Sequence, residues 1–226
     1  MSELRTRIIR PAPYTQTYDA MRAFTKSRTP ETPDQLWLCE HSPVYTLGQA
    51  SQPEHIITPY DIPVIQTDRG GQITYHGPGQ VVAYILNDTR RKAYYIKDHV
   101  RRIEQAVIAT LADYGVTGIL VDGAPGVYVR TAESQTDTTT PQLERFQGLA
   151  KISALGVKVS NHCTYHGVSL NVKMDLQPFS WINPCGYEGL KTVDMFTMKA
   201  CLAQNTWENA WEEVALMLAK NLEQML

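Results

Sequence analysis

Short hydrophobic runs recur along the first half of the chain. Most of them are bounded by Gly, Pro or Asp. They lie at residues 36–39, 44–47, 63–65, 81–86 and 126–129. Runs of this length with turn-forming residues around them are typical of β-strands. The pattern therefore predicts a first half that is rich in β-structure.

Two other segments carry hydrophobic residues at helical spacing. In the first, residues recur every three or four positions at Val100, Ile103, Val107, Leu111 and Tyr114. This spacing predicts an amphipathic helix that ends at Gly115. The same periodicity from Trp207 to Met225 predicts a second helix at the end of the sequence, with Thr206 as its N-cap. The aromatic residues of both helices are expected in the core.

The segments after residue 148 are again strand-like. Residues 149–156, 157–159 and 168–172 resemble antiparallel strands joined by short turns. Before them, residues 131–147 contain few hydrophobic side chains, which predicts a polar surface insertion. No repeat or interdomain linker interrupts the chain. The sequence therefore predicts one α+β domain over residues 1–226, with a mixed, mainly antiparallel sheet flanked by helices.

The composition narrows the classes of function. Of the 226 residues, 43% are hydrophobic and 19% are charged, which is typical of a globular protein. The formal net charge of −2 gives no overall basic field, so neither nucleic acid nor an anionic membrane is an expected partner. The longest hydrophobic runs are too short to span a bilayer, and the first ten residues show no export signal. We therefore expect a cytoplasmic protein.

The cysteines provide a candidate for covalent chemistry. None of the four forms a CxxC pair, so they are expected to be free thiols. Cys185 lies between Pro184 and Gly186, a setting that favours presentation of the thiol to a ligand, although a lone cysteine is often a small buried hydrophobic residue. Cys39 and Cys201 have hydrophobic neighbours and are expected in the core.

A nucleophilic thiol needs a base or cation beside it, because its ordinary pKa is about 8.5. Strand alternation places Lys151 on one face with Leu149, Ser153 and Leu155, which favours a position in a cleft wall. The alternative is an edge-strand lysine that reaches into water. His166 is a second candidate, by analogy with Cys/His enzymes. The residue pattern leaves this choice open.

A glycine-rich segment over residues 68–80 is a candidate ligand-binding loop, since its backbone can approach a ligand closely. The alternative is a hairpin turn that contains a hydrogen-bonded histidine. His162, Cys163 and His166 could form half a zinc site, but no second close pair of Cys or His exists, so no metal is expected. Basic residues 90–102 form either a solvated surface or a docking site for an acidic partner.

Five ordered segments together closely resemble the lipoyl(octanoyl) transferase family. They are EHSPVYTLG at 40–48, RGGQITYHGPGQ at 69–80, KISALG at 151–156, YHGVSLN at 165–171 and NPCG at 183–186. The resemblance implies a fold similar to the catalytic domain of biotin and lipoate protein ligases. It also implies octanoyl transfer, without a cofactor, from octanoyl-acyl carrier protein to a lysine of lipoyl domains. The implied acceptors are 2-oxo-acid dehydrogenase complexes and the glycine-cleavage H protein.

The same resemblance implies roles for individual residues. Cys185 corresponds to the acyl-thioester nucleophile, and Lys151, in preference to His166, to the group that lowers its pKa. Ala154 stands where the family often has Ser, so no hydroxyl is required there. The segments that correspond to the acyl-binding pocket contain Arg69, Gly70, Gly71, Gln72, Ile73, Thr74, Tyr75, His76, Ala154, Leu155, Gly156, Gly167, Val168 and Ser169.

Two alternatives stay open at this level. An ATP-dependent lipoate or biotin ligase would share the fold but would not need Cys185. Biotin ligases are also expected to carry a Gly-Arg-Gly-Arg loop, whereas residues 69–72 read Arg-Gly-Gly-Gln. A non-catalytic acyl-binding module would keep the pocket without an activated thiol. The reactivity of Cys185 separates these alternatives from a transferase.

Overall fold

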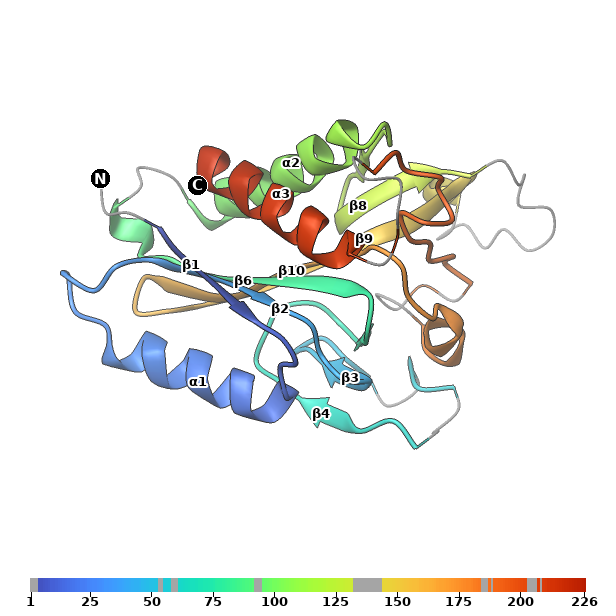
Figure 1. Ribbon diagram of the computed structural model, residues 1–226. Helices are drawn as coiled ribbons and strands as arrows, with labels where there is room; N and C mark the ends of the chain where they lie inside the picture. The colour runs from blue at the N-terminus through green and yellow to red at the C-terminus, as the bar shows by residue number, and fades with distance from the viewer. Residues whose placement is uncertain are drawn as a thin grey trace.

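A mixed seven-stranded sheet forms the centre of the computed structural model, which describes residues 4–52, 55–57, 61–91, 95–131, 144–183, 187, 189–202, 207 and 209–226 (Figure 1). Strands β1 and β2 are parallel, and all other neighbouring pairs in this sheet are antiparallel. The strand order is β1 (Arg5–Ile9), β2 (Gln35–Cys39), β6 (Gln80–Leu86), β10 (Cys163–Asn171), β9 (Leu149–Ser160), β8 (Ala124–Arg130) and β7 (Ile119–Val121).

A second, smaller sheet has the order β4 (Val64–Gln66), β3 (Val44–Leu47) and β5 (Thr74–His76). Helices α2 (Ile96–Asp113) and α3 (Ala210–Met225) lie side by side on one face of the large sheet, and α1 (Tyr14–Ser27) lies on the other (Figure 1). Short 3₁₀ helices occupy Thr89–Arg91, Glu144–Phe146 and Gln177–Trp181. The predicted α+β class and mainly antiparallel sheet are therefore confirmed.

The central strands are buried on both faces. In β2, Leu36 and Leu38 pack in the core under α2 and α3, whereas Trp37 and Cys39 pack toward α1. Strand β6 alternates in the same way, and each of its seven residues is buried. Helices on both sides of a sheet need hydrophobic residues at consecutive positions. This is why the sequence showed continuous runs there.

Helix α1 was not predicted, because its buried face is only partly hydrophobic. The buried positions are Tyr14, Thr17, Met21 and Thr25, so two of the four are threonines. The predicted C-terminal helix begins at Ala210, with Asn209 at its N-cap; Thr206 lies outside the described residues.

Residues 149–160 form one continuous twelve-residue strand, β9, where two strands were predicted. The turn to β10 comes later, at Asn161 and His162, whose φ angles of 48° and 62° are those of a type I′ hairpin. The predicted polar surface insertion also ends differently from the prediction: Phe146, near its end, is fully buried rather than on the surface. Residues 132–143 of that insertion lie outside the described residues.

Two predictions about cysteines had different outcomes. Cys39 is fully buried, as expected. Cys201 is exposed, so its predicted core position is wrong. Its hydrophobic neighbours Ala200 and Leu202 both pack into the core, and the residue between them faces outward. Hydrophobic flanks therefore did not imply burial of this thiol.

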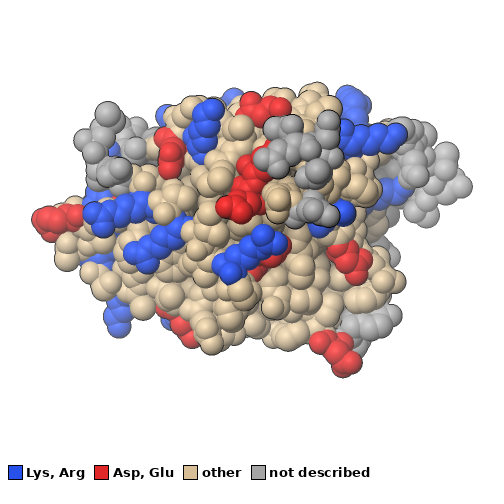
Figure 2. All heavy atoms as spheres, viewed as in Figure 1, with Lys and Arg blue, Asp and Glu red and all other residues tan. Residues whose placement is uncertain are grey.

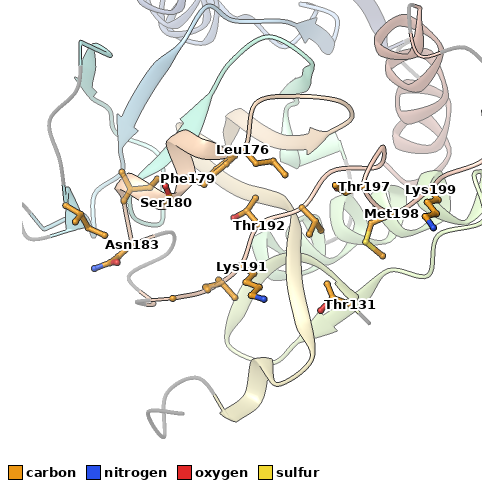
Figure 3. Close-up of a pocket in the computed structure, with 15 residues that line it drawn as sticks. Thr131, Leu176, Phe179, Ser180, Asn183, Lys191, Thr192, Thr197, Met198 and Lys199 are labelled. Atoms are coloured by element: carbon orange, nitrogen blue, oxygen red, sulfur yellow. The ribbon is translucent and has the colours of Figure 1, made fainter. Parts of the chain in front are cut away.

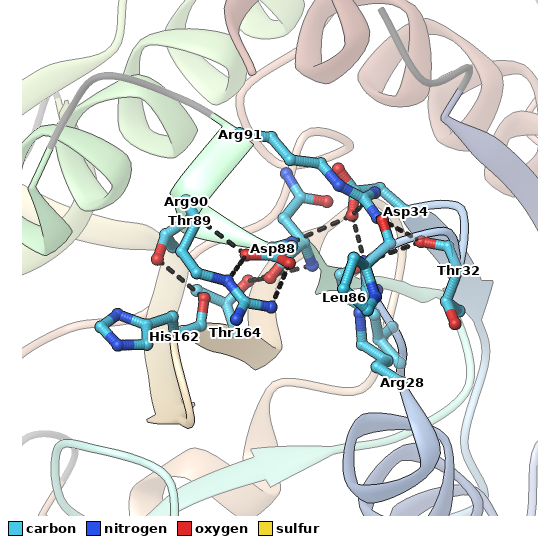
Figure 4. Close-up of polar contacts among 12 residues, drawn as sticks. Arg28, Thr32, Asp34, Leu86, Asp88, Thr89, Arg90, Arg91, His162 and Thr164 are labelled. Carbon is cyan, nitrogen blue, oxygen red and sulfur yellow. Dashed lines mark hydrogen bonds and ion pairs between the residues drawn. The ribbon is translucent and has the colours of Figure 1, made fainter.

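A buried ion-pair network joins the end of α1 to the ends of β2 and β6 (Figure 4). The Arg28 guanidinium pairs with the Asp34 carboxylate, and both side chains are almost completely buried. Arg91 donates to the same carboxylate at 2.9 Å, and Arg90 pairs with Asp88. Arg90 and Arg91, two of the basic residues that were candidates for docking an acidic partner, therefore form ion pairs within the protein.

Charged side chains of both signs are interspersed on the face seen in Figure 2, with a mostly uncharged area below them. Among the helices that the structure describes, none combines the length and hydrophobicity needed to cross a bilayer.

Replacing Asp34 with Ala should lower the free energy of unfolding by about 3–5 kcal/mol, because the buried Arg28 charge would lose its partner. Urea denaturation measures the change. Glu31→Ala is the matched control, since Glu31 is an exposed carboxylate three residues away and should cost far less. Equal losses in the two variants would contradict a stabilising role of the network.

Candidate active site

The three predicted pocket segments meet at one narrow cavity. Strands β9 and β10 pair there, with Ala154 opposite Ser169, and the loop before β5 covers them. Of the fourteen predicted pocket residues, twelve line this cavity: Arg69, Gly71, Gln72, Ile73, Thr74, His76, Ala154, Leu155, Gly156, Gly167, Val168 and Ser169. Segments that are far apart in the sequence therefore form one site.

The other two predicted residues have different positions. The Gly70 N–H donates to the Val157 carbonyl at 3.0 Å and so ties the loop to β9. Tyr75 packs against Tyr45 and Phe179 in a separate hydrophobic cluster. Neither is among the residues that line the narrow cavity.

Four residues that the sequence pattern did not select also line the cavity: Tyr14, Val82, Tyr84 and His166. Tyr14 had no signal because α1 was not predicted. Val82 and Tyr84 belong to a strand that was predicted correctly, but the run gave no indication of which face would meet a ligand. The sequence pattern suggested His166 as a base or as part of half a zinc site, not as a pocket residue.

Close approach of the loop to β9 requires a glycine at position 156. A Cβ atom on Gly156 would lie 2.7 Å from the Gly70 carbonyl oxygen, closer than real contacts allow. Arg69 fixes the other side of the loop, because its Nη2 donates to the carbonyl oxygen of Thr46 at 2.6 Å. The loop is thus held between β3 and β9.

The Lys151 side chain lines a small cavity beside β9. A β-bulge, rather than regular strand alternation, places it there. Strand β8 pairs Val127 with Ser153 and Tyr128 with Lys151, so Ile152 is an extra residue in a β-bulge. The bulge changes the alternation.

The side chains on either side of the bulge show its effect. Ile152 and Leu155 both pack in the core under α2 and α3. Lys151 and Ala154 instead line a second small cavity. The predicted face shared by Lys151 and Leu155 is therefore wrong.

The Lys151 side chain is buried, with 3% exposure. Its Nζ donates to the Pro125 carbonyl oxygen at 3.0 Å and lies 5.2 Å from the centre of the Tyr128 ring. The alternative of an edge-strand lysine that reaches into water is wrong. Burying an ammonium group is unfavourable, and such groups cluster at functional sites.

Cys185, Pro184 and Gly186 lie outside the described residues. The chain on either side of them is fixed: the Asn183 N–H donates to the His55 carbonyl at 2.9 Å, and the Lys151 N–H donates to the Lys191 carbonyl at 2.8 Å. Both flanking segments border an open groove of about 680 Å³ (Figure 3).

Shared side chains place three cavities next to one another. The open groove and the Lys151 cavity share Phe179 and Thr192. The Lys151 cavity and the narrow cavity share Thr74, Ala154 and Ser169. Lys151 therefore lies between a large open groove and a much smaller, narrow cavity.

His166 lies far from Lys151. It pairs with Val157, six residues along β9, which corresponds to about 20 Å at about 3.3 Å per residue. Its Nε2 bonds to Asp68 at 3.0 Å. Burial favours a higher pKa for Asp68, but hydrogen bonds from His166, Tyr165 and Tyr18 hold that pKa well below its usual range. His166 therefore belongs to the far end of the narrow cavity.

Two neutral histidines support this cavity: His76 lines it, and His41 bonds to the lining residue Tyr84. The His41 Nδ1–H donates to the Ala12 carbonyl at 2.5 Å, so its Nε2 accepts from the Tyr84 hydroxyl at 2.7 Å. The His76 Nδ1–H donates to Gln80 at 2.7 Å. Burial lowers the pKa of His41 to about 4, and burial together with the nearby His41 lowers that of His76 to about 3. Both imidazoles are therefore uncharged at neutral pH.

Within the described part of the chain, no three His, Cys, Asp or Glu side chains are grouped as metal ligands. The site thus consists of a buried ammonium, a narrow cavity lined by both apolar and polar side chains, and an open groove. A buried cation beside a thiol would favour the thiolate, and small-molecule sites in proteins are concave and mostly apolar with a few polar groups, as this narrow cavity is.

Comparison with known proteins identifies relatives over nearly the whole chain. The sequence profile of the lipoyl protein ligase A/B catalytic domain matches residues 13–205. The octanoyltransferase of Albidiferax ferrireducens is 54% identical over 221 residues, which cover 94% of this chain and 93% of the relative. That of Variovorax paradoxus is 55% identical over 215 residues, which cover 93% and 92%.

A solved structure supports the fold independently. The bipartite lipoate protein ligase of Thermoplasma acidophilum superposes with a TM-score of 0.72 over 100% of this chain and 84% of that one, at 14% sequence identity. Similarity at this level of identity concerns the fold alone.

The buried histidines predict a pH dependence of stability. Between pH 6.5 and about 4, unfolded His41 and His76 bind protons that the folded protein does not, so stability falls as the pH falls. Each should contribute a slope of up to about 1.4 kcal/mol per pH unit. Urea denaturation of wild type and His41→Gln across this range tests the effect. The variant should show a smaller slope, and an unchanged slope would contradict neutral burial of His41.

Proposed function

This chain belongs to the lipoyl protein ligase A/B catalytic domain family, and we propose that it transfers octanoyl groups in protein lipoylation by a covalent relay through Cys185. The proposed donor is octanoyl-acyl carrier protein. The proposed acceptors are lysines of the lipoyl domains of 2-oxo-acid dehydrogenase complexes and of the glycine-cleavage H protein. The observation that best supports the relay is the buried Lys151 ammonium between the open groove and the narrow cavity.

In the proposed first step, the Cys185 thiolate attacks the carbonyl carbon of the donor thioester. The bond from that carbon to the carrier sulfur breaks, and the carrier leaves as a thiol after its sulfur takes a proton from the Lys151 ammonium, which becomes a neutral amine. Lys151 as an ammonium lowers the pKa of the Cys185 thiol, whose ordinary value of about 8.5 leaves little thiolate at neutral pH. The product is an octanoyl thioester on the enzyme.

In the proposed second step, the neutral amine of the acceptor lysine attacks the enzyme thioester. An amide bond forms, the bond to the Cys185 sulfur breaks, and neutral Lys151 accepts a proton from the attacking nitrogen. Lys151 therefore serves as a cation in one step and as a base in the other. Its position beside the open groove suits access for both protein substrates.

The octanoyl chain would occupy the narrow cavity. Ile73 and Val82 contribute hydrophobic surface there, and Tyr84 and His166 lie farther from Lys151. Because all four side chains are buried, and Tyr84 and His166 are also held by hydrogen bonds, the cavity is largely preformed. A preformed apolar cavity lowers the entropic cost of binding a flexible chain.

The proposed relay predicts a covalent intermediate. Octanoyl-acyl carrier protein, added without ATP or acceptor, should leave one octanoyl group on Cys185. Mass spectrometry of peptides locates the group, hydroxylamine should release it, and a lipoyl domain should convert it to an amide. Cys185→Ser should abolish efficient transfer, whereas Cys201→Ser, at an exposed cysteine, should not. Transfer that requires ATP and free octanoate would instead identify a ligase.

Replacing Lys151 with Met should reduce transfer by about 100-fold or more, because the thiolate loses its cation and the second step its base. Thiol alkylation against pH, in a Cys201→Ala background, should show a higher pKa for Cys185. Lys158→Met, on the same strand, is the control and should behave like wild type. An unchanged alkylation pKa in Lys151→Met would remove Lys151 from the mechanism.

A further inference from the structure

One peptide group joins helix α2 to the candidate active site. The carbonyl oxygen of Pro125 accepts a hydrogen bond from Lys151 Nζ at 3.0 Å. The N–H of the same peptide, from Gly126, donates to Glu104 Oε1 at 2.9 Å. A carboxylate and an ammonium thus bind opposite ends of one peptide dipole.

The local geometry of β8 requires this orientation. The C=O and N–H of a trans peptide point in opposite directions, so a carbonyl aimed at Lys151 directs its N–H away from it. Gly126 has a φ of 120°, a conformation that favours glycine. A Cβ atom there would lie 2.5 Å from the Ser153 carbonyl oxygen and 2.8 Å from Lys151 Cε.

Glu104 is suited to hold the peptide in place. It lies on α2 and is half-buried. Burial raises the pKa of Glu104, while the Gly126 N–H and the charges of Lys151 and Arg101 act in the opposite direction. The charge on Lys151 therefore favours the carboxylate form of Glu104 through space, and the two side chains also bind the same peptide.

We infer that Glu104 is a positioning residue for Lys151, acting through the Pro125–Gly126 peptide to hold the ammonium in place and favour its charged form. This inference rests on the proposed role of Lys151 in the transfer reaction. A carboxylate beyond a polarised peptide stabilises a cation at its carbonyl end, because hydrogen bonds in a chain strengthen one another.

Other groups around Lys151 need to be considered. Tyr128, on β8, presents its ring to Nζ. Residues 191–193 contact Lys151 through main-chain hydrogen bonds, and Lys191 itself is exposed. Cys185 lies outside the described residues. The cavity side chains beside Lys151 do not titrate; they are Thr74, Ser153, Ser169, Asn171 and Thr192.

The test is the pKa of Lys151 in Glu104→Gln. The amide oxygen can still accept the Gly126 N–H, so the variant should fold, but the negative charge is gone. Losing that charge disfavours the ammonium, so the pKa of Lys151 should fall by about one unit. The pH dependence of the ¹⁵N side-chain signal of Lys151, assigned by its loss in Lys151→Met, measures this without any substrate.

Glu212→Gln removes an exposed carboxylate from α3 and is the matched control, which should leave the Lys151 titration unchanged. Thermal denaturation checks that both variants fold. If Glu104→Gln does not fold, Glu104→Asp should shift the pKa of Lys151 in the same direction, because it withdraws the carboxylate by one methylene.

An unchanged Lys151 titration in a folded Glu104 variant would overturn the inference and leave Glu104 as a structural contact of β8. The proposed function fails in a different way. If Lys151→Met transfers octanoyl groups at the wild-type rate, Lys151 is not part of the reaction, whatever its titration shows in Glu104→Gln. A shifted pKa together with a lower transfer rate in Glu104→Gln supports the positioning role.

Discussion

The buried ammonium of Lys151 is the constraint on which the geometry of this site depends. A cation with 3% exposure is stable only where the protein supplies polar partners in place of water. The Pro125 carbonyl and the Tyr128 ring face the ammonium, while main-chain hydrogen bonds to residues 191–193 fix its strand. The side-chain and main-chain contacts of Lys151 together therefore join β8, β9 and the segment after Cys185.

Close packing of the loop before β5 against strand β9 forms one side of the narrow cavity. The loop before β5 reaches β9 because position 156 lacks a side chain, and Arg69 holds the loop to β3. Beside it, both ring nitrogens of the neutral His41 make hydrogen bonds, and Nδ1 of the neutral His76 bonds to Gln80. These hydrogen bonds resist movement of the wall, because a shift would leave a buried polar group unpaired. The cavity is therefore narrow and largely preformed.

The sequence pattern predicted strands best where every residue of the strand is buried. The runs in β2 and β6 marked those strands, since packing on both faces leaves little room for polar residues. It was least informative for α1, where Thr17 and Thr25 occupy half of the buried positions. The boundary between β9 and β10 was also misplaced, because the turn uses Asn161 and His162 rather than glycine.

The sequence by itself determined the fold class and the candidates Cys185 and Lys151, since these depend on local residue types in a fixed order, while the pocket segments followed from the resemblance of its motifs to a known family. Only the tertiary structure decided how Lys151 is presented and which groups surround it. A single bulge at Ile152 turns Lys151 to the same side as Ala154 and separates it from Leu155. Pairing of β9 with β10 places His166 at the far end, and the packing of α2 brings Glu104 to the Gly126 N–H. Strand register and helix packing arise from contacts between distant residues, which a local pattern does not contain.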